Sequence, residues 1–305
     1  MAVDWGNDHK ACNLEKYECL ECDKEFIVGA EMIGETGVQC PYCGSRHIDD
    51  TVGTNDEFLM DLDLGCLNLI MKKKVVSIHQ PCYIPYLGIF YKIWKSDMFV
   101  FLDDAQYSNG YVFDWNRIRT PQGEARLKIP LERKFGDLLT EVKPKDFLGW
   151  REKHLKTIEM NYKRAPYFAD VFFGFRECLM AQYGSLAELN MATMELFMDK
   201  FGWDIPTFRS SDMKLETRSE ARVIEIVKRI GGEIYLSGTG GRNYQTEAHF
   251  ADAGIKLAYS GFRPLEYRQQ WGSFLPNMSV LDYCMNEGFD IDGFFSRVEE
   301  VHSDE

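Results

Sequence analysis

The sequence predicts an α/β protein: a parallel or mixed Rossmann-like sheet with a helical block, preceded by a small zinc ribbon. Two Cys-x-x-Cys pairs stand within the first 48 residues. From residue 75 onward, short β-branched or aromatic runs alternate with amphipathic stretches, which is typical of a parallel sheet with crossover helices. Residues 150–203 hold helical patterns alone, so we expect them to form a separate layer or cap.

The composition is that of a globular protein. Of its 305 residues, 45% are hydrophobic and 27% are charged, which excludes collagen-like and wholly disordered chains. Residues 1–70 hold 15 acidic and 4 basic side chains, whereas residues 71–305 hold 33 and 31. Nucleic acid is therefore a disfavoured partner, because phosphate binding needs basic surface. Without an apolar run of membrane-spanning length or a signal-peptide pattern, we expect a cytoplasmic protein with no membrane partner.

Four cysteines predict one structural zinc ion per chain. Cys19 and Cys22 form one pair, Cys40 and Cys43 form the other, and 17 residues separate the pairs. Two such turns supply four thiolates that close a tetrahedral site. Residues 15–48 contain too few apolar side chains for a core, so the metal would supply the folding free energy.

The flanks of the first cysteine pair, residues 17–18 and 24–28, predict a small β-hairpin of the zinc-ribbon type. The alternatives are a redox Cys-x-x-Cys and a pair of disulfides. A redox dithiol would need no second pair, and disulfides are rare in the cytoplasm.

An acidic linker divides the chain. Residues 49–70 hold six acidic side chains and no Lys or Arg, which is typical of a linker. Met71, three lysines and a strand follow it, as at the start of an independent domain. We therefore expect a zinc-ribbon segment at 1–48, a linker at 49–70 and an α/β domain at 71–305.

The elements of the large domain follow from its hydrophobic periodicity. The expected strands are 75–79, 98–103, 125–130, 206–210, 233–237 and 255–260. The expected helices are 88–96, 150–162, 167–183, 185–201, 219–230, 246–253 and 280–287. Thr217 and Glu220 have the spacing of a capping box, Ser279 and Asp282 form a similar start, and Gly231 ends the preceding helix.

Polar side chains follow the first two strands of the predicted sheet. His79 and Gln80 come directly after an apolar strand, and Asp103, Asp104 and Gln106 come after the next one. In parallel α/β sheets ligands bind at this edge. The histidine could be a general base or a phosphate contact, and the carboxylates could position an amine. The alternatives are a strand cap for His79 and a solvated turn for the two acids.

Two further segments could bind an anion. Arg117 and Arg119 share one face of an extended stretch that suits a phosphate or a carboxylate, although plain surface arginines remain an alternative. Ser237 and Gly238 open a glycine-rich turn, SGTGGR, between a strand and a helix, which is the layout of an anion-binding loop. A simple glycine turn is the alternative there.

These segments together resemble the WbqC-like family. The matching blocks run in order within residues 74–288: IHQPCYIPYLGIFYKIWKSDMFVFLDDAQYS, NRIRTPQG, KH at 153–154 with NYKRAPYF at 161–168, LSGTGGRNY and YRQQWGSFLPNMSVLDYCMNEG. The zinc-ribbon segment lies outside the family pattern, and Cys82 stands where the family is expected to have Asn. The positions carried over from the resemblance are His79, Gln80, Tyr83, Pro85, Gly88, Asp103, Asp104, Gln106, Arg117, His154, Tyr162, Ser237, Gly238, Tyr244, Tyr267 and Asp282.

The resemblance implies a role in O-antigen or other polysaccharide biosynthesis. The implied reaction transfers an aminoacyl group of the glycyl type, or another acyl group. The acceptor would be an amine of a nucleotide sugar or related small molecule. His79, Asp103, Asp104 and Arg117 are the expected catalytic residues. The expected substrate-binding residues are Gln80, Tyr83, Gly88, Gln106, His154, Tyr162, Ser237, Gly238, Tyr244, Tyr267 and Asp282. A nucleotide or an activated acyl donor would be the co-substrate. The alternatives are a transferase that modifies nucleotides or nucleic-acid bases, and a non-catalytic ligand-sensing adaptor whose ribbon binds a protein partner.

Overall fold

The computed structural model describes residues 14–21, 25–29, 43, 48–49, 73–110 and 112–303. The chain divides into two compact units, residues 1–72 and 73–305. In the smaller unit, β1 (Leu14–Cys19) pairs antiparallel with β2 (Glu25–Gly29) and β3 (Ile48–Asp49). The hairpin predicted around the first cysteine pair is confirmed. Cys22 and Cys40 lie outside the described residues, so the zinc site stays a prediction.

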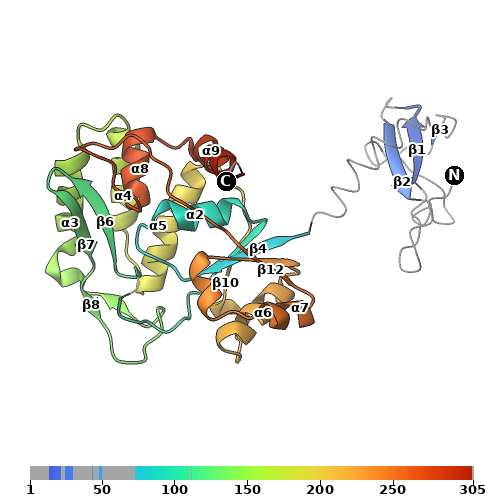
Figure 1. Cartoon of the computed structure of the whole chain (residues 1–305), viewed down its shortest axis with the longest axis horizontal. Helices are drawn as coiled ribbons and strands as arrows, with labels where there is room; N and C mark the ends of the chain where they lie inside the picture. Colours follow the sequence, from blue (N-terminus) through green and yellow to red (C-terminus); the bar gives the residue numbers. More distant parts are fainter. Residues whose placement is uncertain are drawn as a thin grey trace. The chain divides into compact units, whose positions relative to one another are not determined.

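The larger unit is built on a five-stranded sheet, drawn in Figure 1. Its strands, in spatial order, are β10 (Thr207–Arg209), β5 (Met98–Phe101), β4 (Val75–His79), β11 (Ile234–Ser237) and β12 (Lys256–Tyr259). Every neighbouring pair is parallel, so the sheet is parallel and not mixed. In chain order the strands lie 3-2-1-4-5, which is a doubly wound arrangement.

Helices cover both faces of this sheet. The crossovers within it carry α2 (Leu87–Trp94), α6 (Ser219–Arg229) and α7 (Glu247–Asp252). Along β5 the side chains alternate, because Phe99 and Phe101 belong to one buried apolar cluster and Val100 to another. The first cluster includes α2 and the helical block, and the second includes α6 and α7.

The helical block lies between β5 and β10 in the chain. It comprises α3 (Trp150–Tyr162), α4 (Phe168–Met180) and α5 (Leu186–Lys200), and it follows the hairpin of β6 (Trp115–Thr120) and β7 (Gly123–Lys128). The short strands β8 (Leu131–Glu132) and β9 (Lys143–Pro144) and the turn η2 (Asp146–Leu148) connect them. Two further helices, α8 (Val280–Glu287) and α9 (Ile291–Ser303), end the described chain.

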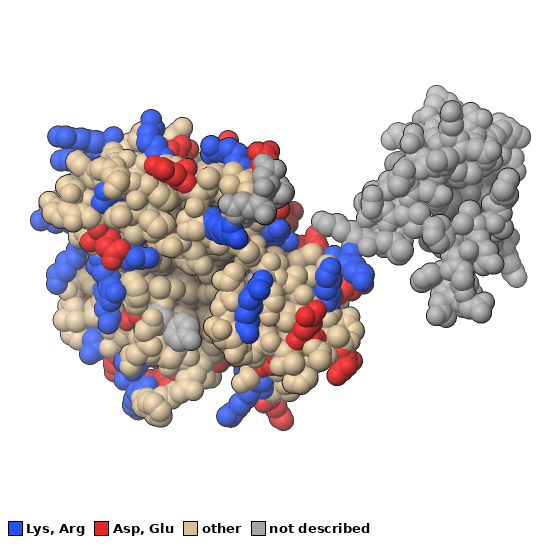
Figure 2. All heavy atoms as spheres, viewed as in Figure 1, with Lys and Arg blue, Asp and Glu red and all other residues tan. Residues whose placement is uncertain are grey.

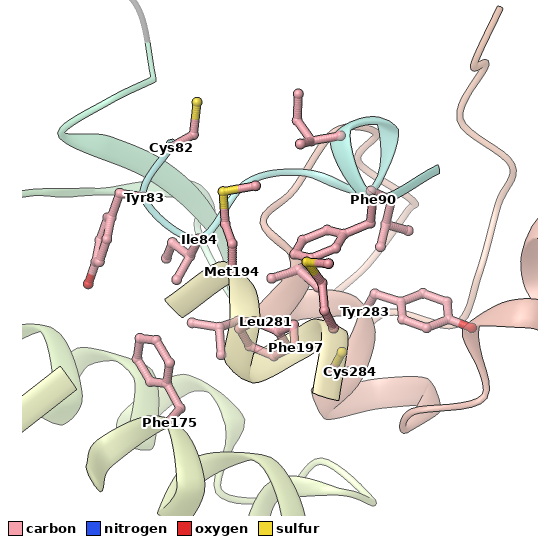
Figure 3. Packing of buried hydrophobic residues seen from close by; sticks show 14 of the residues in the cluster. Cys82, Tyr83, Ile84, Phe90, Phe175, Met194, Phe197, Leu281, Tyr283 and Cys284 are labelled. Atoms are coloured by element: carbon pink, nitrogen blue, oxygen red, sulfur yellow. The ribbon is translucent and has the colours of Figure 1, made fainter. Parts of the chain in front are cut away.

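Side chains from distant segments form the larger core. Figure 3 shows Phe90 of α2, Phe197 of α5 and Leu281 of α8 packed together. Phe90 and Phe197 meet edge to face with ring centroids 6.2 Å apart. Because each is almost completely buried, the helical block and the sheet share one core.

The predicted capping box before α6 is wrong. Helix α6 begins at Ser219, and no side chain caps its first turn. The Thr217 hydroxyl donates instead to Glu225, and the Glu220 carboxylate accepts a 2.6 Å hydrogen bond from the backbone N–H of Thr246. Glu220 therefore fixes the start of α7 and not of its own helix. Within the described part of the chain, no helix combines the length and apolar character needed to cross a bilayer.

Candidate functional site

The strand order places the chain's reversal point between β4 and β11. After β4 the chain crosses toward β5, and after β11 it crosses toward β12, on the opposite side. The loops that leave the two strands therefore diverge at the carboxyl edge of the sheet. In doubly wound sheets this topological switch point is where ligands bind.

The backbone hydrogen bonds show where the two strands part. The β4–β11 pairing ends at Ser77 and Leu236. One step later, the His79 carbonyl accepts a 2.8 Å hydrogen bond from Leu102, on the β5 side, and the Ser237 carbonyl accepts one of 2.8 Å from Ser260, on the β12 side. Alternate carbonyls of a parallel strand face alternate neighbours, so these two bonds belong to the β5 and β12 sides. On the side between them, β4 and β11 have no pair beyond Ser77 and Leu236, and we call this end of their pairing the split.

His79 ends β4 at this split. Its Nδ1 lies 2.8 Å from the Gln80 carbonyl, and because a carbonyl oxygen can only accept, Nδ1 carries the proton and Nε2 the lone pair. Burial, and next the charge of Lys92, lower the pKa of His79 to about 3. The imidazole is therefore neutral at pH 7, with one open acceptor nitrogen.

Lys92 also lies at this edge, and the sequence patterns did not predict it as a site residue. It belongs to α2, is only 2% exposed, and donates a 2.8 Å hydrogen bond from Nζ to the carbonyl of Ile78. Burial lowers the pKa of Lys92 to about 7. The available signal was a single lysine inside the apolar helix sequence LGIFYKIW.

Cys82 lies beside the same group. Its thiol is 3.3 Å from the Gln80 carbonyl and its Sγ is 3.8 Å from Nδ1 of His79. Burial raises the pKa of Cys82 to about 12, so the sulfur stays protonated and donates to the carbonyl. Although Cys82 stands next to a histidine, it is not an activated thiolate.

The glycine-rich loop after β11 forms the other side of the split. Ser237 is buried, and Gly238 precedes the turn η4 (Thr239–Asn243). A Cβ on Gly241 would lie 2.3 Å from the Ser237 hydroxyl oxygen, so only glycine fits there. The Arg242 guanidinium stacks 4.7 Å from the ring centre of Tyr259, at the end of β12. Tyr244, a predicted binding residue, is 71% exposed in the same loop.

Asp103 and Asp104 follow β5 at this edge, but both carboxylates have protein partners. Asp103 is buried and accepts hydrogen bonds from the Ser210 hydroxyl at 3.1 Å and the Ser211 hydroxyl at 2.6 Å. Asp104 forms an ion pair with Arg222 of α6. The two acids thus connect β5 to β10 and α6, while their predicted role toward an amine stays a prediction. Gln106, also after β5, is exposed and forms a β-bridge with Leu138.

Arg117 belongs to the β6–β7 hairpin and not to the parallel sheet. Its guanidinium pairs with Glu124 at 2.8 Å and donates to the carbonyl of Asn277 at 3.3 Å. Arg119 on the same strand is buried and donates to the carbonyls of Trp271 and Ser273. The two arginines therefore hold the segment between β12 and α8.

Tyr162, Tyr267 and Asp282, three of the predicted binding residues, form one buried network. The Asp282 carboxylate accepts hydrogen bonds from the Tyr162 hydroxyl at 2.6 Å and the Tyr267 hydroxyl at 2.7 Å. Gln269 donates a third, also of 2.7 Å. Burial raises the pKa of Asp282, and these three donors oppose that rise. Substrate contact by these residues stays a prediction.

His154 and Tyr83 form a hydrogen bond with each other inside the core. The His154 Nε2 lies 3.2 Å from the Lys128 carbonyl, so it carries the proton, and Nδ1 accepts a 3.0 Å hydrogen bond from the Tyr83 hydroxyl. Burial lowers the pKa of His154 to about 4.

A Cβ on Gly88 would lie 2.4 Å from the ring of Tyr86, which explains the glycine at the start of α2.

The surface around these elements has no single sign of charge on the face shown in Figure 2, where Lys and Arg are interspersed with Asp and Glu. In the same view the surface is hollowed between the part that contains β6–β8 and the part that contains β10 and α6.

A cavity of about 490 Å³ lies beside the edge strand β10 and is lined by Phe101, Glu195, Thr207, Phe208, Arg209, Asp212, Met213 and Arg229. The described residues contain no cluster of three or more His, Cys, Asp or Glu side chains that could hold a metal ion.

The fold and the split edge define a doubly wound α/β protein with polar loops at its switch point. The chain belongs to the WbqC-like protein family, which matches residues 80–291. It is 31% identical over 224 residues to the "Uncharacterized protein Rv1507c" of Mycobacterium tuberculosis (strain ATCC 25618 / H37Rv), a match that covers 70% of this chain and 94% of the relative. No solved structure is significantly similar to the chain.

Proposed function

We propose that the larger unit is a transferase that moves an aminoacyl group of the glycyl type, or another acyl group, to an amine of a nucleotide sugar or related small molecule. The observation that carries the proposal is the split between β4 and β11, because it brings His79 and the SGTGGR loop to one edge. Membership of the WbqC-like family agrees with the resemblance that implied this chemistry.

The loop after β11 would bind the anionic part of the substrate. Its backbone N–H groups lie before the first turn of α7, and Arg242 adds a positive charge. Glycine-rich turns bind phosphates through backbone N–H groups that converge on the anion, and this role falls to the loop itself because Glu220 already bonds the start of α7. The nucleotide diphosphate would therefore occupy this side of the split.

His79 would take the proton in the transfer step. A bond forms between the amine nitrogen and the acyl carbon, the bond from that carbon to its leaving group breaks, and one proton leaves the nitrogen. The unprotonated Nε2 of His79 can receive it. Burial is the larger cause of the low pKa of His79 and the Lys92 charge the second, so an anionic substrate beside Lys92 would offset only the second and make the imidazole a somewhat stronger base.

The test is amide formation by the full-length protein, with glycyl-adenylate as donor and UDP-linked or dTDP-linked amino sugars as acceptors, followed by mass spectrometry. His79→Gln should lower the rate by about 10²-fold or more while the unfolding midpoint changes little. Lys95→Met is the control, because that lysine is exposed and pairs with Glu299. Equal rates for the two variants would contradict the role of His79, and the absence of any product would contradict the transferase.

A further inference from the structure

The buried side chain of Lys92 lies where the pairing of β4 with β11 ends. Between β4 and β11 the strand pairing ends at Ser77, and the next carbonyl on that side of β4 is that of Ile78. Lys92 Nζ donates to this carbonyl at 2.8 Å, in the position where a continued β11 strand would have paired. A lysine of α2 thus places its Nζ beside the end of β4, at the switch point.

This lysine has unused capacity for hydrogen bonding. An ammonium group has three N–H donors, and within the described residues Lys92 makes one hydrogen bond, to Ile78. No carboxylate among those residues lies within ion-pair distance of it. The titratable groups that face it are His79 at the end of β4 and Cys82 in the following loop, and both are uncharged at pH 7.

A buried lysine without a counter-ion is costly for the folded protein. Removing an ammonium from water is unfavourable unless an anion or a set of acceptors replaces the water. Packing alone does not call for a charge, because the neighbours of Lys92 on α2 are apolar and buried. Such a group at a ligand-binding edge indicates a functional role.

We propose that Lys92 is the buried cationic contact for an oxyanion group of the ligand, a phosphate or a carboxylate, that enters the split between β4 and β11. This rests on the proposed function only for the position of the ligand at this edge. The oxyanion accepts hydrogen bonds from the donors that Lys92 leaves unused. The Lys92 amine, which is partly deprotonated near pH 7, becomes fully protonated when the anion binds.

The experiment is isothermal titration calorimetry of the full chain at pH 7.5, with inorganic pyrophosphate as the phosphate probe and acetate as the carboxylate probe. Two buffers with different ionisation enthalpies give the number of protons taken up. We expect one probe to bind with net proton uptake, and Lys92→Met to weaken that binding roughly 10- to 100-fold and to remove the uptake. The probe that binds identifies the source of the oxyanion.

Two further variants make the result specific. Lys95→Met removes a lysine from the same helix that is exposed and paired with Glu299, and it should bind like the wild type. Lys92→Arg keeps the charge and should retain more affinity than Lys92→Met. Equal affinity of Lys92→Met and Lys95→Met, or binding of neither probe by the wild type, would overturn the proposal.

The outcome is separable from that of the transferase assay. Binding that depends on Lys92 together with absent amide formation would contradict the proposed function and support this inference. Amide formation together with binding that does not depend on Lys92 would contradict this inference and leave the transferase standing.

Discussion

The Tyr162 hydroxyl donates a 2.6 Å hydrogen bond to the Asp282 carboxylate and accepts one of 2.8 Å from the backbone N–H of Arg119. One phenol on α3 thus connects the β6–β7 hairpin to α8. Because Asp282 is fully buried, its charge depends on such donors for stabilisation. We therefore expect the loss of these hydrogen bonds to lower the free energy of unfolding.

Replacing Asp282 by Asn should lower the free energy of unfolding by about 1–3 kcal/mol. The amide can accept through only one oxygen, so donors from Tyr162, Tyr267 and Gln269 lose an acceptor inside the core. Chemical denaturation of the two proteins measures the difference. The exposed Asp212→Asn should stay within about 0.5 kcal/mol of the wild type, and a similar loss for both variants would contradict the network's importance.

The stability of the protein should depend on Lys92 in alkaline solution. Its pKa is lowered to about 7 by burial, whereas an unfolded lysine has a pKa of about 10.4, so the unfolded state binds more protons between these values. The free energy of unfolding should therefore rise with pH over that window, by up to about 1.4 kcal/mol per pH unit. In Lys92→Met this contribution disappears, which denaturation curves at pH 7, 8 and 9 would show. An unchanged slope in the variant would assign the dependence to other groups.

Gly241 and Gly240 offer a matched pair in the loop after β11. A Cβ on Gly241 would lie 2.3 Å from the Ser237 hydroxyl oxygen and 2.4 Å from Gln245 Oε1, whereas nothing lies within 4 Å of one on Gly240. We expect Gly241→Ala to cost about 1–3 kcal/mol of stability and to weaken anion binding. Gly240→Ala should change the unfolding midpoint little. Equal effects would mean that the loop rearranges freely.

Zinc content tests the four-cysteine site of the smaller unit. The wild-type chain should hold one zinc ion, bound through Cys19, Cys22, Cys40 and Cys43, and Cys40→Ser should lose tightly held metal. Cys12→Ser should keep it, because that cysteine stands outside the two pairs. Metal analysis after dialysis decides, and stoichiometric zinc in Cys40→Ser would disprove the assignment.

A chain of residues 71–305 should fold cooperatively and keep ligand binding. The reason is that the parallel sheet and both of its apolar clusters are formed by residues from 75 onward. Thermal unfolding and pyrophosphate titration of this fragment are the measurements. An insoluble or molten fragment would mean that residues 64–70 or the smaller unit complete its core.

Several elements were fixed by local pattern. The strand at 75–79 and the helices at 150–162 and 280–287 have the predicted bounds, because apolar periodicity depends on neighbouring residues. The capping pair predicted at Ser279 and Asp282 is wrong, since no side chain caps the start of α8. Helix α9 was missed, although Ile291, Phe294, Phe295 and Val298 are buried at helical spacing. The capping box at Thr217 failed because its partners lie elsewhere in space, at Glu225 and Thr246.

Local sequence patterns are enough to predict that polar residues such as His79, Asp103 and Ser237 follow strands of an α/β domain, since strand ends and turns depend on nearby residues. Three further facts come from the folded structure: β11 lies beside β4, serine hydroxyls bond the Asp103 carboxylate, and Lys92 reaches the split between the strands. These facts depend on strand order and on the packing of α2, which arise from contacts between residues distant in the chain. The position of Lys92 in an apolar helix is explained only by the Ile78 carbonyl that its side chain contacts.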